Sequence, residues 1–502
     1  MSPAPDGFPS VEASIELKGS RTWVYVVWAA WAVGLVVYSQ TFAFTADEGF
    51  HLLAAQLVMH GKRPYLDFCF PQTPLNVYWN ALWMRFFGDS WRTAHVVAAL
   101  ETIGAVILAS RFVLTRLPER AWRLAGAVAA TLLIGCNSNV ADFGTLGQAY
   151  GMCLFTTVCA FYLAVAAVAS RPTWRAALAG ACAGTAACSS LLAAPIAPVL
   201  LVWIWWSNRA GNRWTKSAAF AVGATVPVAP IIRSFLRAPA VVWFNIAQYH
   251  LHYRVIYWPQ PLGHDLDTLT SWFGDSQSLL LGLLALFGVI YIRTRSGWSP
   301  ERRAEFFLCA WLAIGLTVEL AVARPTFTRY FCLLAPFLGI LAIPGLYAIG
   351  SRVLQPDRPF WPVLLISVLC VGSLIREICV YLDSDTWPKY EVVAQKLKSV
   401  TPPGQEIFTE ECFYFLTKHP PPPGLEFQYS HKLDLPPARR AAFHIETDAE
   451  IKQQIAAGAF WSAATCDDDF VEDYNLDKSF QSQEKVRDCP VYWGGPPKDD
   501  SK

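Results

Sequence analysis

Two adjacent carboxylates, Asp47 and Glu48, follow directly after the first long apolar stretch of the chain, and a third, Asp67, comes after a turn with glycine and proline. Carboxylates at a membrane face can act as general bases on an acceptor hydroxyl or amine, or can coordinate a metal ion. Acidic residues also stabilise helix N-termini by about 0.3–1 kcal/mol, so helix capping is the alternative interpretation of Asp47 and Glu48. All three are therefore candidate catalytic residues.

Candidate phosphate ligands lie in a second segment, ARPTFTRYFCLLAP, which contains Arg324, Arg329 and Tyr330. A guanidinium group pairs with phosphate oxygens through two parallel hydrogen bonds, so both arginines suit an anionic leaving group. The alternative is that arginine and tyrosine anchor the ends of membrane helices at the interface.

Other polar residues are weaker candidates. Asp142 lies in a short loop and Glu101 within an apolar stretch, and both are candidates for acceptor binding or support. A carboxylate inside a membrane span is a functional hypothesis by default. His250 and His252 could bind metal or pack at the interface, and no CxxC or Cys/His zinc spacing occurs. Whether a divalent metal takes part is therefore open from the sequence.

The composition of the chain indicates that a membrane domain carries these candidate residues. Of its 502 residues, 54% are hydrophobic and only 16% are charged. Soluble domains have about 25% charged residues. A membrane helix needs roughly 20 apolar residues, and this length predicts about eleven spans. They cover about residues 23–43, 93–114, 122–136, 148–169, 174–190, 191–206, 217–236, 279–292, 305–323, 330–350 and 362–382.

The positions of Lys and Arg predict the topology, since short cytoplasmic loops carry an excess of positive charge. Basic clusters follow the second, fourth, sixth, eighth and tenth predicted spans, and they share one side if the N-terminus, with Lys18 and Arg21, is cytoplasmic. The polar N-terminal stretch has no apolar core of a cleavable signal peptide. The predicted parts are a cytoplasmic segment 1–22, a membrane domain 23–382 with outer loop 44–92, and an extracytoplasmic domain 383–502.

The first outer loop and the C-terminal region predict local structure of their own. Phe50, Leu53 and Leu57 recur at helical spacing, which predicts an amphipathic helix along the membrane surface. The roughly 120 C-terminal residues suffice for one small α/β domain. In it KYEVVAQKLKSV predicts a helix, and GQEIFTE and CFYFL predict short strands. Cys466 and Cys489 could form a disulfide in an oxidising compartment.

The order of these parts resembles the GT-C glycosyltransferases. A first membrane helix is followed by the acidic pair, HLLAAQLVMHGKRPYLDF, PQTPL and an aromatic run. Within that fold the chain is similar to bacterial relatives of protein O-mannosyltransferases and of lipid A aminoarabinose transferases, most closely over about residues 40–90. The resemblance implies an all-α polytopic membrane domain with a small outer α/β domain. It also implies transfer of a sugar from a polyprenyl-phosphate donor to an acceptor lipid, glycan or protein at the outer face of a bacterial inner membrane.

The resemblance also assigns roles to residues. Asp47 matches the family's first-loop catalytic acid, which we take as the base, with Glu48 beside it and Asp67 as a further loop carboxylate. Arg329 and Tyr330 match a basic residue followed by tyrosine at the start of a helix. In Gln72-Thr73-Pro74-Leu75 neither an acidic nor a basic residue precedes Pro-Leu, unlike in many relatives. This departure leaves a second catalytic carboxylate and a phosphate-binding lysine in question at that point.

Two other classes of membrane protein compete with this interpretation. One is a lipid-linked-sugar translocator or other transporter without transferase chemistry, and the other is a polymerase or ligase of lipid-linked glycans. Many transporters have internal sequence repeats, and we find none in this chain. Polymerases and ligases of lipid-linked glycans usually have their large functional loop late in the chain, whereas the acidic loop of this chain comes first. A net charge of +1 provides no basic face for nucleic acid, so the expected partners are lipids, sugars and the acceptor.

Overall fold

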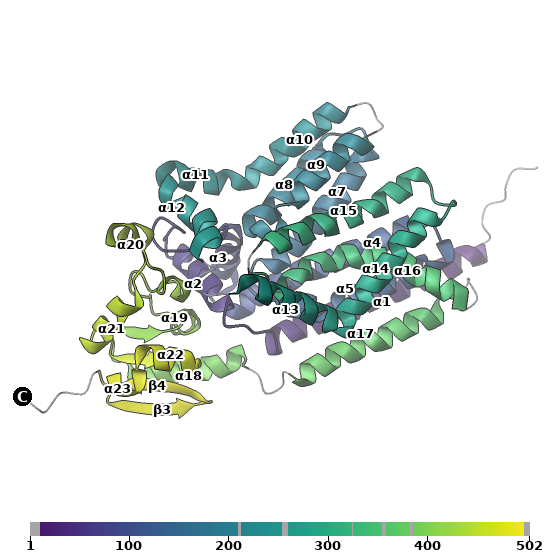
Figure 1. The fold of residues 1–502 in the computed structure, drawn as a ribbon. Helices are drawn as coiled ribbons and strands as arrows, with labels where there is room; N and C mark the ends of the chain where they lie inside the picture. Colours follow the sequence, from purple (N-terminus) through teal and green to yellow (C-terminus); the bar gives the residue numbers. More distant parts are fainter. Residues whose placement is uncertain are drawn as a thin grey trace, which may run out of the picture.

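The computed structural model describes residues 11–208, 212–253, 260–323, 325–353, 358–380 and 385–495, with side chains from Thr22 onward. A bundle of helices forms the membrane domain, and a smaller domain of short helices and strands follows it at one end (Figure 1). The predicted fold class, an all-α membrane domain with a C-terminal α/β domain, is confirmed.

Eight helical segments in the described part of the chain are long and apolar enough to cross a membrane, with 19 to 26 residues each. Roughly 20 residues span the hydrocarbon core, so this is a multi-pass membrane protein. The segments are Thr22–Thr41 of α1 (Val11–Thr41), α4 (Trp91–Arg116), α7 (Tyr150–Val168), Arg213–Arg237 with α10 (Arg213–Thr225) and α11 (Ala229–Arg237), α14 (Ser276–Thr294), α15 (Pro300–Val322), Thr328–Arg352 with η6 (Thr328–Leu334) and α16 (Ala335–Val353), and Phe360–Cys379 of α17 (Phe360–Val380).

The three other predicted spans form helices that are shorter than a membrane is thick. These are α5 (Arg123–Gly135), α8 (Trp174–Ser189) and α9 (Ile196–Ser207), with 13, 16 and 12 residues. At 1.5 Å per residue their lengths are about 18–24 Å, against about 30 Å of hydrocarbon. Each of the eleven predicted spans thus corresponds to a helix, and in the described part of the chain eight of these helical segments reach the length of a full membrane span.

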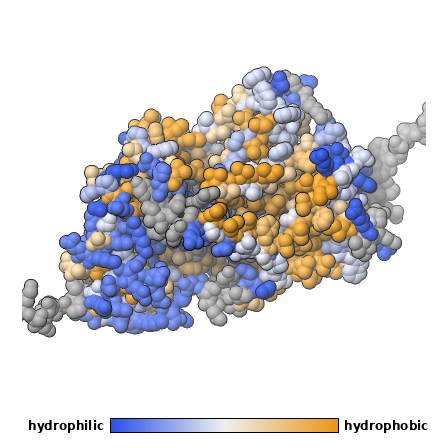
Figure 2. All heavy atoms as spheres, viewed as in Figure 1, coloured by the Kyte–Doolittle hydropathy of each residue, from blue (hydrophilic) through white to orange (hydrophobic). Residues whose placement is uncertain are grey.

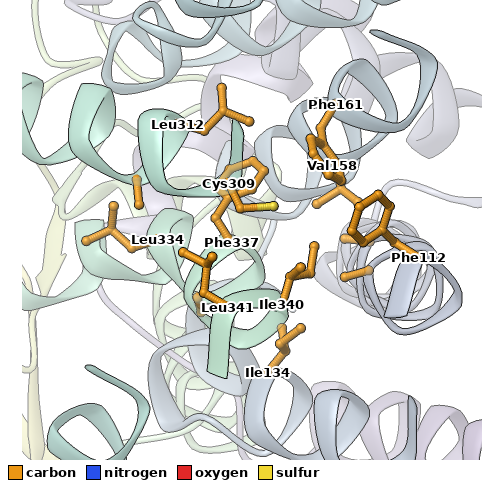
Figure 3. Packing of buried hydrophobic residues seen from close by; sticks show 14 of the residues in the cluster. Phe112, Ile134, Val158, Phe161, Cys309, Leu312, Leu334, Phe337, Ile340 and Leu341 are labelled. Carbon is orange, nitrogen blue, oxygen red and sulfur yellow. The ribbon is translucent and has the colours of Figure 1, made fainter. Parts of the chain in front are cut away.

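Aromatic rings and close backbone contacts hold the bundle together. Phe112 of α4 packs against Phe161 of α7 with ring centroids 4.9 Å apart, and Phe161 lies 6.0 Å from Phe337 of α16 (Figure 3). The helices α14 and α16 touch at Gly288, where a Cβ would lie 1.9 Å from the Leu341 carbonyl oxygen. Small residues permit such close packing of membrane helices, so Gly288 sets the distance between these two.

The C-terminal domain begins with α18 (Trp387–Val400) and has a four-stranded sheet in the order β1-β2-β4-β3. Strand β1 pairs in parallel with β2, and the other pairs are antiparallel. Hydrophilic residues dominate its surface, whereas apolar residues dominate the helical bundle (Figure 2). Its further elements are β1 (Ile407–Thr409), α19 (Glu411–Thr417), α20 (Pro437–Phe443), α21 (Asp448–Ala456), β2 (Ser462–Ala464), α22 (Asp468–Tyr474), α23 (Leu476–Ser479), β3 (Ser482–Val486) and β4 (Cys489–Trp493).

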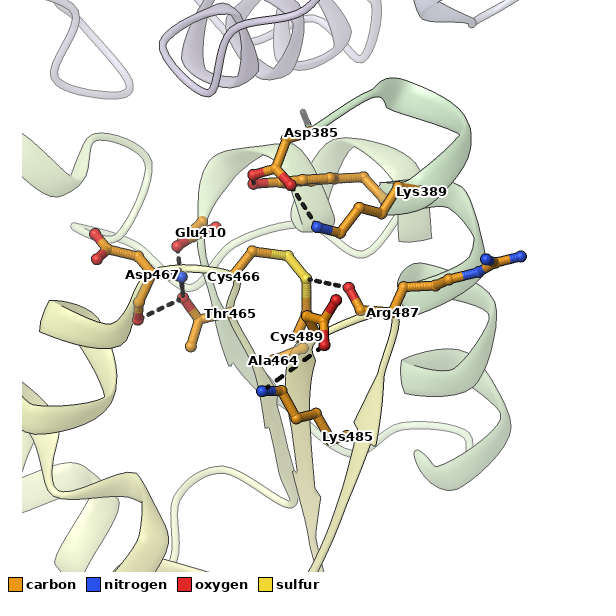
Figure 4. Close-up of a disulfide and its surroundings, with 12 residues drawn as sticks. Asp385, Lys389, Glu410, Ala464, Thr465, Cys466, Asp467, Lys485, Arg487 and Cys489 are labelled. Carbon is orange, nitrogen blue, oxygen red and sulfur yellow. Dashed lines mark hydrogen bonds and ion pairs between the residues drawn. A yellow bond between two sulfur atoms is a disulfide. The ribbon is translucent and has the colours of Figure 1, made fainter. Parts of the chain in front are cut away.

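Most local predictions for this domain are confirmed. The predicted helix is α18, and GQEIFTE contains β1. The prediction of a strand for CFYFL is wrong, since these residues belong to α19 and are nearly all buried. A short apolar run has no periodicity that separates a buried strand from a buried helix. Cys466 and Cys489 form a disulfide that ties the end of β2 to β4 (Figure 4).

The first loop is covered by the C-terminal domain. It contains α2 (Glu48–Met59) and α3 (Leu75–Phe87), which lie between the bundle and that domain (Figure 1). The predicted helix at α2 is confirmed, but its residues Glu48 to Leu57 are all buried. The expected polar surface face is thus absent from α2, because α19 packs on it. At Gly49 a Cβ would lie 2.5 Å from the Cys412 sulfur, so glycine permits this contact.

A buried carboxyl group in the C-terminal domain makes its stability depend on pH. Burial raises the pKa of Glu410 to about 8, although the hydrogen bond from the Thr465 hydroxyl lowers it (Figure 4). An unfolded glutamate titrates near about 4.3. Between these two values the folded chain binds more protons than the unfolded chain, so stability falls as pH rises through this window.

We therefore expect Glu410→Gln to stabilise the protein at pH 8 and to have a much smaller effect at pH 5. Each pKa unit corresponds to about 1.4 kcal/mol, so the shift from about 4.3 to about 8 sets an upper limit of about 5 kcal/mol on the gain at pH 8. Thermal unfolding at the two pH values measures this difference. Glu406→Gln is the control, because Glu406 is half exposed and pairs with His419. Equal gains at both pH values would contradict the assignment.

Candidate functional site

A cavity of about 640 Å³ lies where the membrane domain meets the C-terminal domain. Its walls come from α2, the segment before α3, the ends of α15 and η6, the π-helix η4 (Phe244–Tyr253), and the C-terminal domain. The polar side chains that line it include Asp47, His51, Thr73, Gln148, Arg329 and Tyr429.

Asp47 lies in the cavity between a cation and a phenol. One carboxylate oxygen is 2.6 Å from the Arg329 guanidinium, and the other accepts a hydrogen bond of 2.9 Å from the Tyr429 hydroxyl. Although Asp47 directly precedes α2, its side chain makes no capping hydrogen bond. Asp47 therefore stands at the N-cap of α2 without capping it through a side-chain hydrogen bond, and its carboxylate faces the cavity.

Arg329 and Tyr330 both line the cavity from η6. The guanidinium carbon of Arg329 lies 4.6 Å from the centre of the Phe327 ring and 5.9 Å from that of Tyr330. These aromatic rings and Asp47 fix the direction of the arginine side chain. Arg324, the second candidate phosphate ligand, lies outside the described residues.

Glu48 does not line the cavity, although it is the neighbour of Asp47. Its fully buried carboxylate accepts a hydrogen bond from the Trp387 indole at 2.9 Å and one from the backbone N–H of Gly147. The His95 ring lies 2.9 Å away, and its other nitrogen faces the Ser39 carbonyl oxygen. The structure thus places Glu48 where α2, α4, the segment before α7 and the C-terminal domain meet.

Asp67 also lies away from the residues that line the cavity. Its carboxylate accepts hydrogen bonds from the Arg63 guanidinium at 2.7 and 2.8 Å and from the Arg63 backbone N–H at 2.7 Å. The Arg63 bonds lower the pKa of Asp67, against a smaller opposing effect of burial. These contacts close the turn after α2, so the geometry favours a structural role over the expected catalytic one.

The two candidates for acceptor binding or support lie elsewhere in the membrane domain. Asp142 lies in α6 (Ser138–Phe143) and accepts a hydrogen bond from the Tyr38 hydroxyl of α1. Burial raises the pKa of Asp142 to about 6, although the Tyr38 bond lowers it. Glu101 lies in α4, and neither residue lines the cavity. Asp142 thus joins α6 to α1 through Tyr38, which fits a supporting role better than acceptor binding.

Comparison of the structure with solved proteins identifies the fold. No family model matches the chain, and no curated protein matches it in sequence. ArnT from Cupriavidus metallidurans is similar with a TM-score of 0.68 at 15% identity, over 94% of this chain and 98% of ArnT. The oligosaccharyltransferase of Archaeoglobus fulgidus is similar with a TM-score of 0.51 at 15% identity. The match covers 88% of this chain and 67% of the oligosaccharyltransferase chain. The chain has the GT-C fold.

The C-terminal domain of this GT-C chain supplies cavity residues that the sequence did not reveal. Tyr429 bonds to Asp47, and Phe427 packs on Phe50 with ring centroids 5.2 Å apart. They lie more than 300 residues beyond Asp47 in a segment without a recognisable motif. His51 was also missed, although a residue four positions after Asp47 lies on the same helix face.

Metal sites in proteins are built from clusters of ligand side chains such as Asp and His, and both residue types line this GT-C cavity. In the part of the chain that the structure describes, no group of three or more His, Cys, Asp or Glu side chains could hold a metal ion. Asp47, the carboxylate beside Arg329, is already bonded to that guanidinium and to Tyr429.

Proposed function

We propose that this chain is a membrane glycosyltransferase that moves a sugar from a polyprenyl-phosphate donor to an acceptor at the outer face of a bacterial inner membrane. The observation that carries the proposal is the meeting of Asp47 and Arg329 at 2.6 Å in the cavity. A carboxylate can accept a proton from the acceptor, and a guanidinium can hold the phosphate that departs. The solved structure of ArnT with undecaprenyl phosphate supports a donor of this kind, with a TM-score of 0.62 at 15% identity over 96% of this chain and 98% of ArnT.

The lining of the cavity supports a donor with both a lipid and a phosphate. Leu191, Leu192 and Val322 contribute apolar surface, which suits a polyprenyl chain that enters from the bilayer. Arg329 and Tyr330 supply a cation and a hydroxyl for the phosphate. The Asp47–Arg329 ion pair then opens, because the phosphate replaces the carboxylate at the guanidinium.

The reaction that follows is a single displacement. Asp47 takes the proton of the acceptor hydroxyl or amine while that atom attacks the anomeric carbon of the sugar. The bond between this carbon and the phosphate oxygen breaks, and the polyprenyl phosphate leaves with its charge held by Arg329. Attack from the face opposite the leaving group inverts the anomeric configuration. Tyr429 positions the carboxylate through its hydrogen bond.

Two features support an orientation with the N-terminus in the cytoplasm and the C-terminal domain outside it. The basic clusters of the short loops then face the cytoplasm, as is typical of membrane proteins. The Cys466–Cys489 disulfide lies in the C-terminal domain, and disulfides persist mainly in oxidising compartments such as the bacterial periplasm.

The test is sugar transfer by the purified protein in liposomes, with a panel of polyprenyl-phosphate sugars and membrane extract as the source of acceptor. We expect the labelled sugar to reach an acceptor while an equal amount of polyprenyl phosphate is released. Movement of the intact donor across the bilayer without release of polyprenyl phosphate would contradict the proposal and favour a translocator.

Transfer is expected to be unaffected by excess chelator, because the charges needed for base catalysis and phosphate binding come from Asp47 and Arg329. The measurement is the initial rate with EDTA, with EDTA plus excess magnesium, and without either. A loss of rate with EDTA that magnesium restores would show that a metal takes part.

A further inference from the structure

The uncharged polar side chains that line the cavity with Asp47 include three from neighbouring segments. His51, Thr73 and Gln148 belong to α2, to the segment before α3 and to the segment before α7. Each is more than nine-tenths buried, with 7%, 3% and 4% of its surface exposed. They are thus part of the interior of the protein and not of an open surface.

A shared contact at Gly147 brings these three segments together. Its backbone N–H donates to Glu48, three residues before His51. Its carbonyl oxygen accepts a hydrogen bond of 3.0 Å from the side-chain amide of Asn76, three residues after Thr73. Gln148 is the next residue after Gly147. Buried hydrogen bonds therefore hold the three segments that carry these side chains next to one another.

Two of these side chains have a buried polar atom with no partner. Among the described residues, nothing forms a hydrogen bond with Nδ1 of His51 or with the hydroxyl of Thr73. Buried polar atoms in folded proteins almost always have a partner. Two such atoms in the wall of one cavity leave two hydrogen-bond positions that a bound polar group can fill.

The chemistry of the three side chains indicates which ligand groups fit. Burial lowers the pKa of His51 to about 3, although Asp47 opposes this effect and Arg329 adds to it. The ring is therefore neutral, and it donates through one nitrogen and accepts through the other. Threonine and glutamine side chains also both donate and accept. Hydroxyl groups, which do the same, match all three.

We propose that His51, Thr73 and Gln148 form a subsite that binds the hydroxyl groups of an uncharged sugar. The inference rests on the proposed glycosyltransferase function and adds the class of sugar. None of the three side chains can neutralise a charge, so the subsite favours a neutral hexose or pentose over an amino sugar or a uronic acid. The donor and a glycan acceptor both offer this chemistry.

The experiment compares wild type with Thr73→Val and His51→Phe, which retain size or ring shape and remove the hydrogen bonds. Equilibrium binding to purified protein in nanodiscs is measured for polyprenyl phosphate without a sugar, with a neutral hexose and with an amino sugar. Thr115→Val and His419→Phe are the matched controls, since neither residue lines the cavity. The KM values for donor and acceptor are measured in parallel.

We expect wild type to bind the neutral sugar lipid more tightly than the bare lipid and the amino sugar lipid. Each variant should lose about three- to tenfold of this preference and bind the bare lipid unchanged. An increase of the acceptor KM alone would assign the subsite to the acceptor sugar. Variants that match wild type in both measurements, or a wild type that prefers the amino sugar, would overturn the subsite.

The two proposals can fail separately. A preference for the neutral sugar that the variants lose, without any sugar transfer, would leave the subsite standing and overturn the transferase. Transfer with an unchanged sugar preference in both variants, and with an unchanged acceptor KM, would overturn the subsite alone.

Discussion

Replacement of Asp47 by asparagine is expected to lower the rate of sugar transfer by about 10²–10⁴-fold, the usual contribution of a general base. Asparagine has the shape of aspartate and still accepts the hydrogen bond from Tyr429, but it cannot take a proton from the acceptor. It also removes the charge that Arg329 faces at 2.6 Å, so donor binding should stay the same or become tighter. The measurement is kcat and the donor KM of reconstituted protein.

Asp67→Asn is the matched control, because it makes the same change in the same loop at a carboxylate that pairs with Arg63 outside the cavity. We expect it to keep transfer within about threefold, since exposed ion pairs contribute at most about 1 kcal/mol. Thermal unfolding of both variants must match wild type for the comparison to hold. An active Asp47→Asn enzyme would remove Asp47 from catalysis, and an inactive, folded Asp67→Asn enzyme would restore the role that the sequence suggested for Asp67.

Site residues could be predicted from the sequence where their immediate neighbours in the chain identify them. Asp47 follows an apolar helix directly, and Arg329 and Tyr330 begin another, so each could be located relative to a membrane span. The helix α18 was predictable because its apolar residues recur with helical periodicity. The disulfide could be named from the sequence only as a possible pair among Cys412, Cys466 and Cys489. The structure shows that Cys412 is free and lies buried against α2.

Contacts between distant segments could not be predicted in this way. Nothing near Tyr429 in the sequence indicates that its hydroxyl reaches Asp47, 382 residues earlier. Glu48 and Asp47 are neighbours in the chain, yet one faces the junction of four segments and the other faces the cavity. Successive residues of a helix point in directions about 100° apart, so two adjacent carboxylates at a helix start need not share a function.

Removal of the Glu48 carboxylate tests that division of roles. We expect Glu48→Ala to lower the free energy of unfolding by about 3–5 kcal/mol, because it leaves the buried partners of this carboxyl group without their hydrogen bonds. Those partners are Trp387 of α18, the Gly147 backbone and His95 of α4. The loss should loosen the C-terminal domain from α2, and faster hydrogen exchange in α18 and α19 than in α7 would detect it.

The conservative change separates a structural Glu48 from a catalytic one. Glu48→Gln retains the size and one acceptor oxygen, so we expect a smaller loss of about 1–3 kcal/mol and transfer that declines only as the fold is lost. Glu391→Gln is the control at the same domain contact, where a partly exposed carboxylate pairs with Arg92 and should matter by less than about 1 kcal/mol. A catalytic carboxylate contributes to kcat and not to the attachment of a domain. A Glu48→Gln protein that is as stable as wild type but slower by orders of magnitude would therefore show that Glu48 is catalytic. Reduced stability with near-normal kcat in the folded fraction would establish it as the residue that holds the C-terminal domain, and with it Tyr429, over the cavity.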